Sequence, residues 1–106
     1  DCVLPTRLAR HNTAITRRGK LNLVNATFRS DHDPIDSGCS CYTCQHFSRA
    51  YLRHLVIAKE MLASTLLSMH NLHTLLQLMR DLRQSILESR MSEFTAEFFE
   101  NRQDTE

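Results

Sequence analysis

The spacing of hydrophobic residues changes near residue 45, and this change divides the chain into two parts. Before it, apolar residues lie in short runs separated by Gly, Pro and charged residues. After it, they recur every three or four residues, which is the spacing of a buried stripe on an α-helix. The pattern predicts an α+β chain in which a small antiparallel sheet is followed by helices.

The first part predicts a β-hairpin. Two β-prone runs, residues 13–16 and 20–26, are joined by Arg17-Arg18-Gly19, and a turn that contains glycine between such runs is a hairpin signal. Upstream, the short apolar run Cys2-Val3-Leu4 is stopped by Pro5. We therefore expect a strand to end there, followed by a polar and basic loop over residues 6–12.

The second part predicts three helices, over residues 45–57, from 58 or 59 to about 88, and over 92–100. A kink near His70-Asn71 is compatible with the second pattern. The predicted buried stripe of the second helix contains Met61, Leu62, Leu66, Met69, Leu72, Leu75, Leu76, Met79, Leu82 and Ile86. A small hairpin cannot cover so much apolar surface. We expect the rest of a larger domain or a second copy of the chain to pack on it.

Composition is ordinary for a globular protein, with 42% hydrophobic and 24% charged residues among 106. No apolar run approaches the roughly 20 residues that span a membrane, so no membrane association is expected. The net charge of +1 is unevenly distributed. Residues 1–30 contain six basic residues and one acidic residue, whereas the remaining 76 contain seven basic and eleven acidic residues. A basic end can face phosphates, although a solvated loop explains the same charge.

Cys39-Ser40-Cys41-Tyr42-Thr43-Cys44 places three thiols within six residues. The crowding favours a metal over disulfides, because neighbouring thiols close only strained rings. A structural zinc takes four Cys or His ligands in a tetrahedron. His70 is the predicted fourth ligand, Cys2 is its main rival, and His32 is a weaker candidate. Reduced, unliganded cysteines remain the alternative. The cluster does not resemble a secreted disulfide framework, so we expect a reducing cytoplasm.

Together these residues resemble the tRNA-guanine transglycosylase (queuine tRNA-ribosyltransferase) family, in its bacterial form. The resemblance covers nearly the whole chain. The matching motifs are Asp1-Cys2-Val3-Leu4-Pro5-Thr6-Arg7, Asn25-Ala26, Pro34-Ile35-Asp36, Cys39-x-Cys41-x2-Cys44, Ser48-Arg49-Ala50-Tyr51-Leu52, His54-Leu55, His70-Asn71 and Leu78-Met79. The chain departs from the family at His11-Asn12-Thr13, where a glycine-bearing turn is usual. Asn tolerates left-handed geometry, so a similar loop is expected.

The resemblance implies an irregular (β/α)8 TIM barrel with a zinc-binding subdomain, of which this chain would be the C-terminal portion. It implies exchange of guanine at the tRNA wobble position for a 7-deazaguanine base such as preQ1, in queuosine biosynthesis. Asp1 would be the nucleophile, Arg7 and Arg10 would contact the anticodon loop, and the enzyme would be a homodimer. The implied zinc ligands, for one structural zinc per chain, are Cys39, Cys41, Cys44 and His70.

The resemblance also divides the chain. Residues 1–10 would hold the end of a barrel strand and the RNA-contacting loop, residues 11–58 the hairpin and zinc-binding subdomain, residues 59–100 the C-terminal helices, and residues 101–106 a frayed tail. The acid/base group and the base pocket would lie upstream, so we expect an incomplete chain that is inactive by itself. The alternative is a stand-alone zinc-stabilised module that binds RNA through basic residues, or dimerises, without catalysis.

Overall fold

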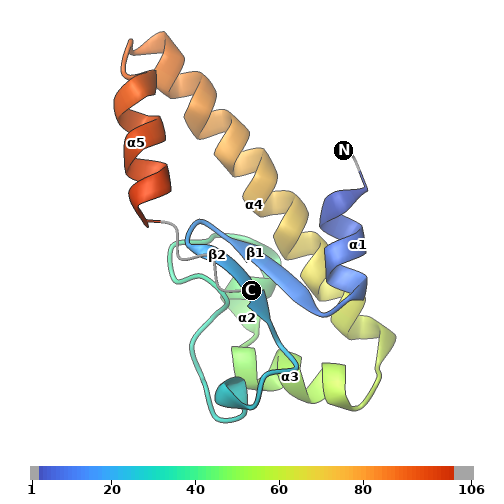
Figure 1. Ribbon diagram of the computed structural model, residues 1–106. Helices are drawn as coiled ribbons and strands as arrows, with labels where there is room; N and C mark the ends of the chain where they lie inside the picture. The colour runs from blue at the N-terminus through green and yellow to red at the C-terminus, as the bar shows by residue number, and fades with distance from the viewer. Residues whose placement is uncertain (1–2, 102–106) are drawn as a thin grey trace.

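The computed structural model describes residues 3–101, and Figure 1 shows how their helices and strands are arranged. The long helix α4 forms the axis of the molecule, with α1 and the hairpin against its first half and α5 folded back beside its last turns. The elements, in chain order, are α1 (Leu4–Arg10), β1 (Thr13–Thr16), β2 (Gly19–Asn22), the 3-10 helix η1 (Ala26–Phe28), α2 (Tyr42–His46), α3 (Arg49–Ile57), α4 (Met61–Leu87) and α5 (Met91–Asn101). The predicted α+β class is confirmed.

Helix α1 corrects the prediction for the segment around Pro5. We expected a strand end followed by a basic loop, but the structure has a helix from Leu4 to Arg10. Pro5 stands in its first turn, where the missing N–H has no intrahelical partner to lose and the fixed φ already suits a helix. Pro5 and Ala9 are buried, and α1 packs on α4. Asn12 follows with a left-handed φ of 64°, as expected for the turn into β1.

The predicted hairpin is confirmed, with a shorter second strand. Strands β1 and β2 pair antiparallel, and Ala14 lies opposite Leu21. We expected the second strand to reach residue 26, but β2 ends at Asn22. Beyond it, the Asn25 side chain caps η1 by accepting a hydrogen bond from the N–H of Thr27 at 3.0 Å. The cap gives the Thr27 N–H a local hydrogen-bond partner, and the chain leaves the sheet at this point.

The helix predicted over residues 45–57 is two helices. The chain is extended at Phe47, with a φ of −134°, and the Ser48 side chain caps α3 by accepting from the N–H of Tyr51. Helix α2 starts earlier than predicted, because Cys41 acts as its N-cap. The 27-residue α4 is one continuous helix through His70, and α5 matches the predicted last helix to within a residue at each end.

The buried face of α4 is offset from the predicted apolar stripe. Of that stripe, Leu66 is buried and Leu75 and Leu82 are half-buried, whereas the other seven are exposed: Met61, Leu62, Met69, Leu72, Leu76, Met79 and Ile86. The covered row instead contains Ala63, Leu66, Leu67, His70, Asn71 and Thr74. Polar residues therefore lie in the packed face of α4, and much of its apolar surface has no cover among residues 3–101.

Within residues 3–101, no helix combines the length and the apolar character that crossing a bilayer requires.

Candidate metal centre

Three thiols and one imidazole meet between α2 and α4. Their ligand atoms all lie within 4.8 Å of one another. His70 Nδ1 is 3.7 Å from the Sγ of Cys39 and 3.3 Å from the Sγ atoms of Cys41 and Cys44. A tetrahedral zinc with ordinary bond lengths places its sulfur and nitrogen ligands about 3.5 Å apart. The four residues therefore form a buried metal site whose donor set and spacing suit structural zinc.

Local backbone geometry brings the thiols together. Cys41 precedes the first turn of α2, and its Sγ accepts a hydrogen bond from the N–H of Cys44 at 3.3 Å. The Sγ of Cys39 accepts in the same way from the N–H of Cys41 at 3.5 Å. These N–H groups are oriented to stabilise negative sulfur. The Thr43 hydroxyl donates to the Leu66 carbonyl at 2.7 Å, which fixes α2 against α4.

The hydrogen bonds of His70 fix the ring in the orientation that a metal ligand needs. Its Nε2 lies 2.8 Å from the Ile15 carbonyl oxygen and 3.3 Å from the Thr74 hydroxyl. A carbonyl only accepts hydrogen bonds, so we assign the proton to Nε2. Nδ1 then directs its lone pair at the three sulfurs. Metal-binding histidines commonly donate their other N–H to a carbonyl in this way.

The three thiols differ in acidity because their hydrogen bonds and their burial differ. Hydrogen bonds from the Cys44 thiol and from the Cys44 N–H lower the pKa of Cys41 to about 3 despite burial. The same contact with Cys41, together with burial, raises the pKa of Cys44. Burial is also the main cause of the raised pKa of Cys39. Three thiolates in one place repel one another unless a cation lies between them.

The other predicted site residues stand apart from this cluster. Asp1 and Cys2 lie outside the described residues. Arg7 and Arg10 are exposed, one turn apart on α1. We expected them on a loop, and the helix gives them a fixed spacing instead. His32, the weaker ligand candidate, is exposed and is not among the four clustered residues.

Asn71 is the main residue that the sequence analysis did not identify. It is fully buried beside His70. Its Oδ1 accepts from the Ile15 N–H at 2.8 Å, and its Nδ2 donates to the carbonyls of Pro5 at 3.0 Å and Thr13 at 3.1 Å. One side chain thus joins α1, β1 and α4. The signal in the sequence was a pair of adjacent polar residues in the middle of an apolar helix, which we had associated with a kink, a family motif and the His70 ligand but not with a packing role for Asn71.

Comparisons with known proteins find matches over nearly the whole chain. Residues 1–104 match a family model described as queuine tRNA-ribosyltransferase. Proteins named queuine tRNA-ribosyltransferase from Staphylococcus aureus strains JH9, Mu50 and NCTC 8325 are each 54% identical to the chain over 100 residues, which is 94% of its length. The chain spans about a quarter of these relatives, 26% of each.

Proposed function

The chain belongs to the queuine tRNA-ribosyltransferase family, and from this premise we propose that it is the C-terminal, zinc-binding part of a tRNA-modifying transglycosylase. The proposed reaction exchanges guanine at the anticodon wobble position for a 7-deazaguanine base, within queuosine biosynthesis. The rest of the enzyme would complete an irregular (β/α)8 barrel and supply the base pocket and the acid/base group.

In the proposed reaction, Asp1 acts as the nucleophile. Its carboxylate attacks C1′ of the target ribose while the bond from C1′ to guanine breaks, and guanine leaves with a proton from a separate acid. The ester that forms holds the RNA while the bases exchange. The incoming base then attacks C1′ through a ring nitrogen and gives up the proton of that nitrogen to the group that served as the acid, while the ester bond breaks and releases the carboxylate. Retaining glycosidases use the same mechanism of two successive displacements at one carbon.

The observation that carries the proposal is the connection between the metal centre and α1. His70 bonds the Ile15 carbonyl, and Asn71 bonds the Ile15 N–H and the Pro5 carbonyl in the first turn of α1. These bonds fix α1, which follows Asp1 directly, relative to the thiol cluster. Zinc, when bound, would cross-link these elements. Its role would be structural, because four protein ligands leave no open coordination position.

Arg7 and Arg10 are the proposed contacts to the anticodon loop. Both are exposed on α1, and neither side chain has an ion pair with residues 3–101. Their guanidinium groups are therefore available for external anions. A planar guanidinium can bind a phosphate through two hydrogen bonds or stack on a base that is turned out of the loop.

A chimera tests this function. Residues 1–104 would replace the matching segment of a Staphylococcus aureus relative, and incorporation of labelled guanine into tRNA would be measured. We expect exchange by the chimera and none by the 106-residue chain alone. Asp1→Asn should abolish both exchange and the covalent RNA adduct on a denaturing gel, while tRNA affinity stays within about twofold. Asp33→Asn is the matched control, since Asp33 is exposed.

Two results would reject the proposal. One is unchanged exchange or adduct formation in Asp1→Asn. The other is unchanged tRNA binding in Arg7→Ala and Arg10→Ala, each of which we expect to weaken affinity by about tenfold.

The exposed row of α4 favours a second candidate, a zinc-stabilised dimerisation module. Leu72, Leu76 and Met79 are between 43% and 55% exposed and lie along one side of the helix. Such a surface usually packs against protein. We propose that the intact enzyme is a homodimer. A purified chimera that sediments as a dimer but exchanges no guanine would favour the module without catalysis.

A further inference from the structure

A cleft of about 740 Å³ lies beside the metal centre, between the β1–β2 turn, the segment 35–40 and α4. Its charged lining consists of Arg17, Arg18, Lys20, Arg49, Asp36 and Asp81. The cations outnumber the acids. Which of these charges are free to bind an external group depends on the contacts that each side chain already makes.

Arg49 is fully occupied by the protein. Its three guanidinium nitrogens donate to the Pro34 carbonyl at 3.0 Å, the Ile35 carbonyl at 2.8 Å and the Asp31 carboxylate at 3.0 Å. Its guanidinium carbon also lies 5.6 Å from the centre of the Phe28 ring. Arg49 therefore fixes the segment that leads to the cysteines, and we assign it no external ligand.

Arg17 is occupied as well. Its guanidinium forms an ion pair with Asp81 on α4, and the other oxygen of that carboxylate accepts from Gln77 at 3.0 Å. The ion pair anchors the hairpin turn to the long helix. Because it removes one cation and one acid together, the ion pair leaves the net charge of the lining unchanged and takes Arg17 out of the cations that could bind an external group.

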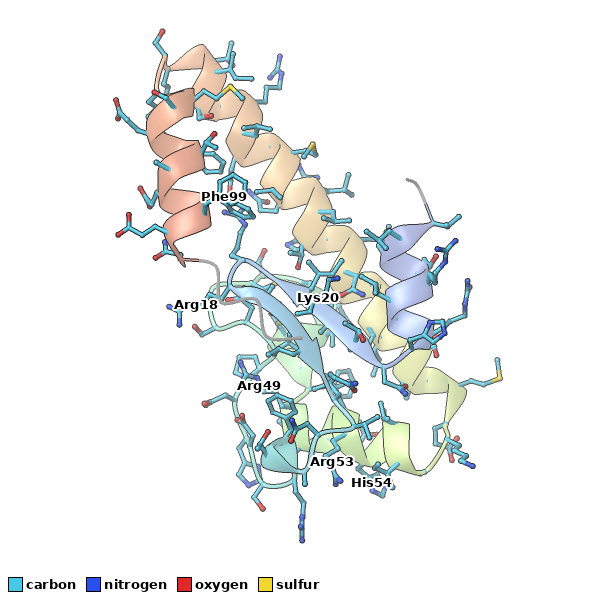
Figure 2. The ribbon with its side chains drawn as sticks, in the orientation of Figure 1. Arg18, Lys20, Arg49, Arg53, His54 and Phe99 are labelled. Carbon is cyan, nitrogen blue, oxygen red and sulfur yellow. The ribbon has the colours of Figure 1, made fainter. Side chains whose placement is uncertain are left out.

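Arg18 and Lys20 are the two cations left over. Both are exposed, and neither side chain has a hydrogen bond or ion pair with any residue from 3 to 101. They come from the β1–β2 hairpin, where Figure 2 labels them. Because no acid neutralises either one, the turn presents two positive charges to the cleft and to solvent.

The turn that carries these cations is rigid. The Thr16 hydroxyl, which is buried, donates to the Gly19 carbonyl at 2.8 Å and accepts from the Arg18 N–H at 3.1 Å. Gly19 takes a φ of 131°, which a side chain would make costly, so glycine closes the turn. With the backbone fixed, a ligand has only two side chains to order, which lowers the entropic cost of binding.

We propose that Arg18 and Lys20 bind phosphate groups of the RNA backbone, at a site separate from Arg7 and Arg10. This rests on the proposed function, in which tRNA is the substrate. An Arg fork and a Lys point charge are the usual ligands of phosphate. A four-residue strand spans about 13 Å, so the turn and the end of α1 are separated by a distance that a few nucleotides of RNA can cover. One RNA can therefore reach both sites.

The experiment measures binding of the zinc-loaded chain to a tRNA with a wobble guanine, over a range of salt concentrations. The test variant is Arg18→Gln/Lys20→Gln. The matched control, Arg80→Gln/Arg83→Gln, removes the same two charges from exposed positions of α4. Circular dichroism and zinc content establish that both variants fold. Two lost phosphate contacts should reduce the slope of log affinity against log salt by about 1.4, which is about 25-fold in affinity at 0.1 M salt.

Each outcome has a defined meaning. A loss near this size in the test variant, with the control within threefold of wild type, supports the proposal. An unchanged test variant overturns it, and leaves the proposed function intact if Arg7→Ala and Arg10→Ala still weaken binding. If no variant changes affinity, both proposals fail.

Competition identifies the ligand. We expect single-stranded RNA to displace tRNA, and inorganic phosphate at constant ionic strength to have no effect. Equal competition by polyglutamate would overturn the RNA assignment in favour of an acidic protein partner. Displacement by inorganic phosphate alone would overturn it in favour of a free-phosphate site.

Discussion

Zinc binding to Cys39, Cys41, Cys44 and His70 should release two protons per ion. Zinc binds thiolates and neutral imidazole, so every protonated ligand must lose its proton first. The pKa of Cys41 is lowered to about 3, so this thiol is already ionised at neutral pH. The pKa values of Cys39 and Cys44 are raised, so both are thiols until zinc binds. In the assigned tautomer of His70 the N–H is on Nε2, and the lone pair of Nδ1 faces the thiols.

The size and sign of the effect follow from this count. Between about pH 6 and 8, which is below the ordinary thiol pKa of about 8.5, two protons compete with each zinc ion for the site. Each rise of one pH unit lowers the proton concentration tenfold, so it weakens this competition tenfold for each of the two protons. The apparent zinc affinity should therefore rise about 100-fold per pH unit. Acidification acts in reverse and releases the metal by protonating Cys39 and Cys44. A chain whose cluster forms only on binding would start with three ordinary thiols, and its affinity would rise about 1000-fold per unit.

Two assays distinguish these cases. Chelator competition between pH 6.5 and 7.5 gives the slope of log affinity against pH. Calorimetry in two buffers with different ionisation enthalpies gives the proton count directly. Thr74→Val is the control, because Thr74 contacts Nε2 and is no ligand. It should weaken zinc binding by about tenfold and leave the proton count at two. Release of three protons would refute the preformed cluster.

Two further changes test the packing around the site. Asn71→Leu leaves three backbone groups, one buried and two partly buried, without their Asn71 partner and should lower the free energy of unfolding by about 2–4 kcal/mol, measured by denaturant in excess zinc. The exposed control Asn22→Leu should cost little, and a loss below about 1 kcal/mol at Asn71 would contradict the reasoning. Arg49→Lys keeps the charge but not the three-pronged contact, so the amides of residues 31–35 should exchange hydrogen faster. Unchanged exchange there, or equal acceleration in Arg53→Lys, would count against the assigned role.

The metal centre was predictable because three of its four ligands lie within six residues of the sequence. Cys-x-Cys-x2-Cys brings three thiols to one helix start whatever the rest of the chain does. The fourth ligand required a choice between His70 and Cys2. Only the packed structure shows that His70 is buried on the long helix and that its second ring nitrogen is hydrogen-bonded to a backbone carbonyl. The hairpin was likewise local, since Gly19 marks its turn.

Helix α1 and the covered face of α4 were not predictable by the same means. Proline both ends strands and begins helices, and the choice at Pro5 depends on the surface of α4 against which α1 packs. Hydrophobic periodicity locates an apolar stripe but not the element that covers it. In α4 the hairpin and α1 cover a row that includes His70, Asn71 and Thr74, because hydrogen bonds to backbone groups compensate the burial of polar atoms.

The same polar row suggests a route by which a structural metal would influence the proposed RNA-binding residues of α1, which it does not touch. Zinc fixes the His70 ring, the ring holds the Ile15 carbonyl, and the neighbouring Asn71 holds both the Ile15 N–H and the Pro5 carbonyl. After the metal ligand itself, every step is a hydrogen bond at a buried side chain of α4. Since a displacement of about 1 Å can cost about 100-fold in rate, loss of zinc should reduce guanine exchange through misplacement of α1. Asn71→Leu should reproduce that loss with zinc still bound.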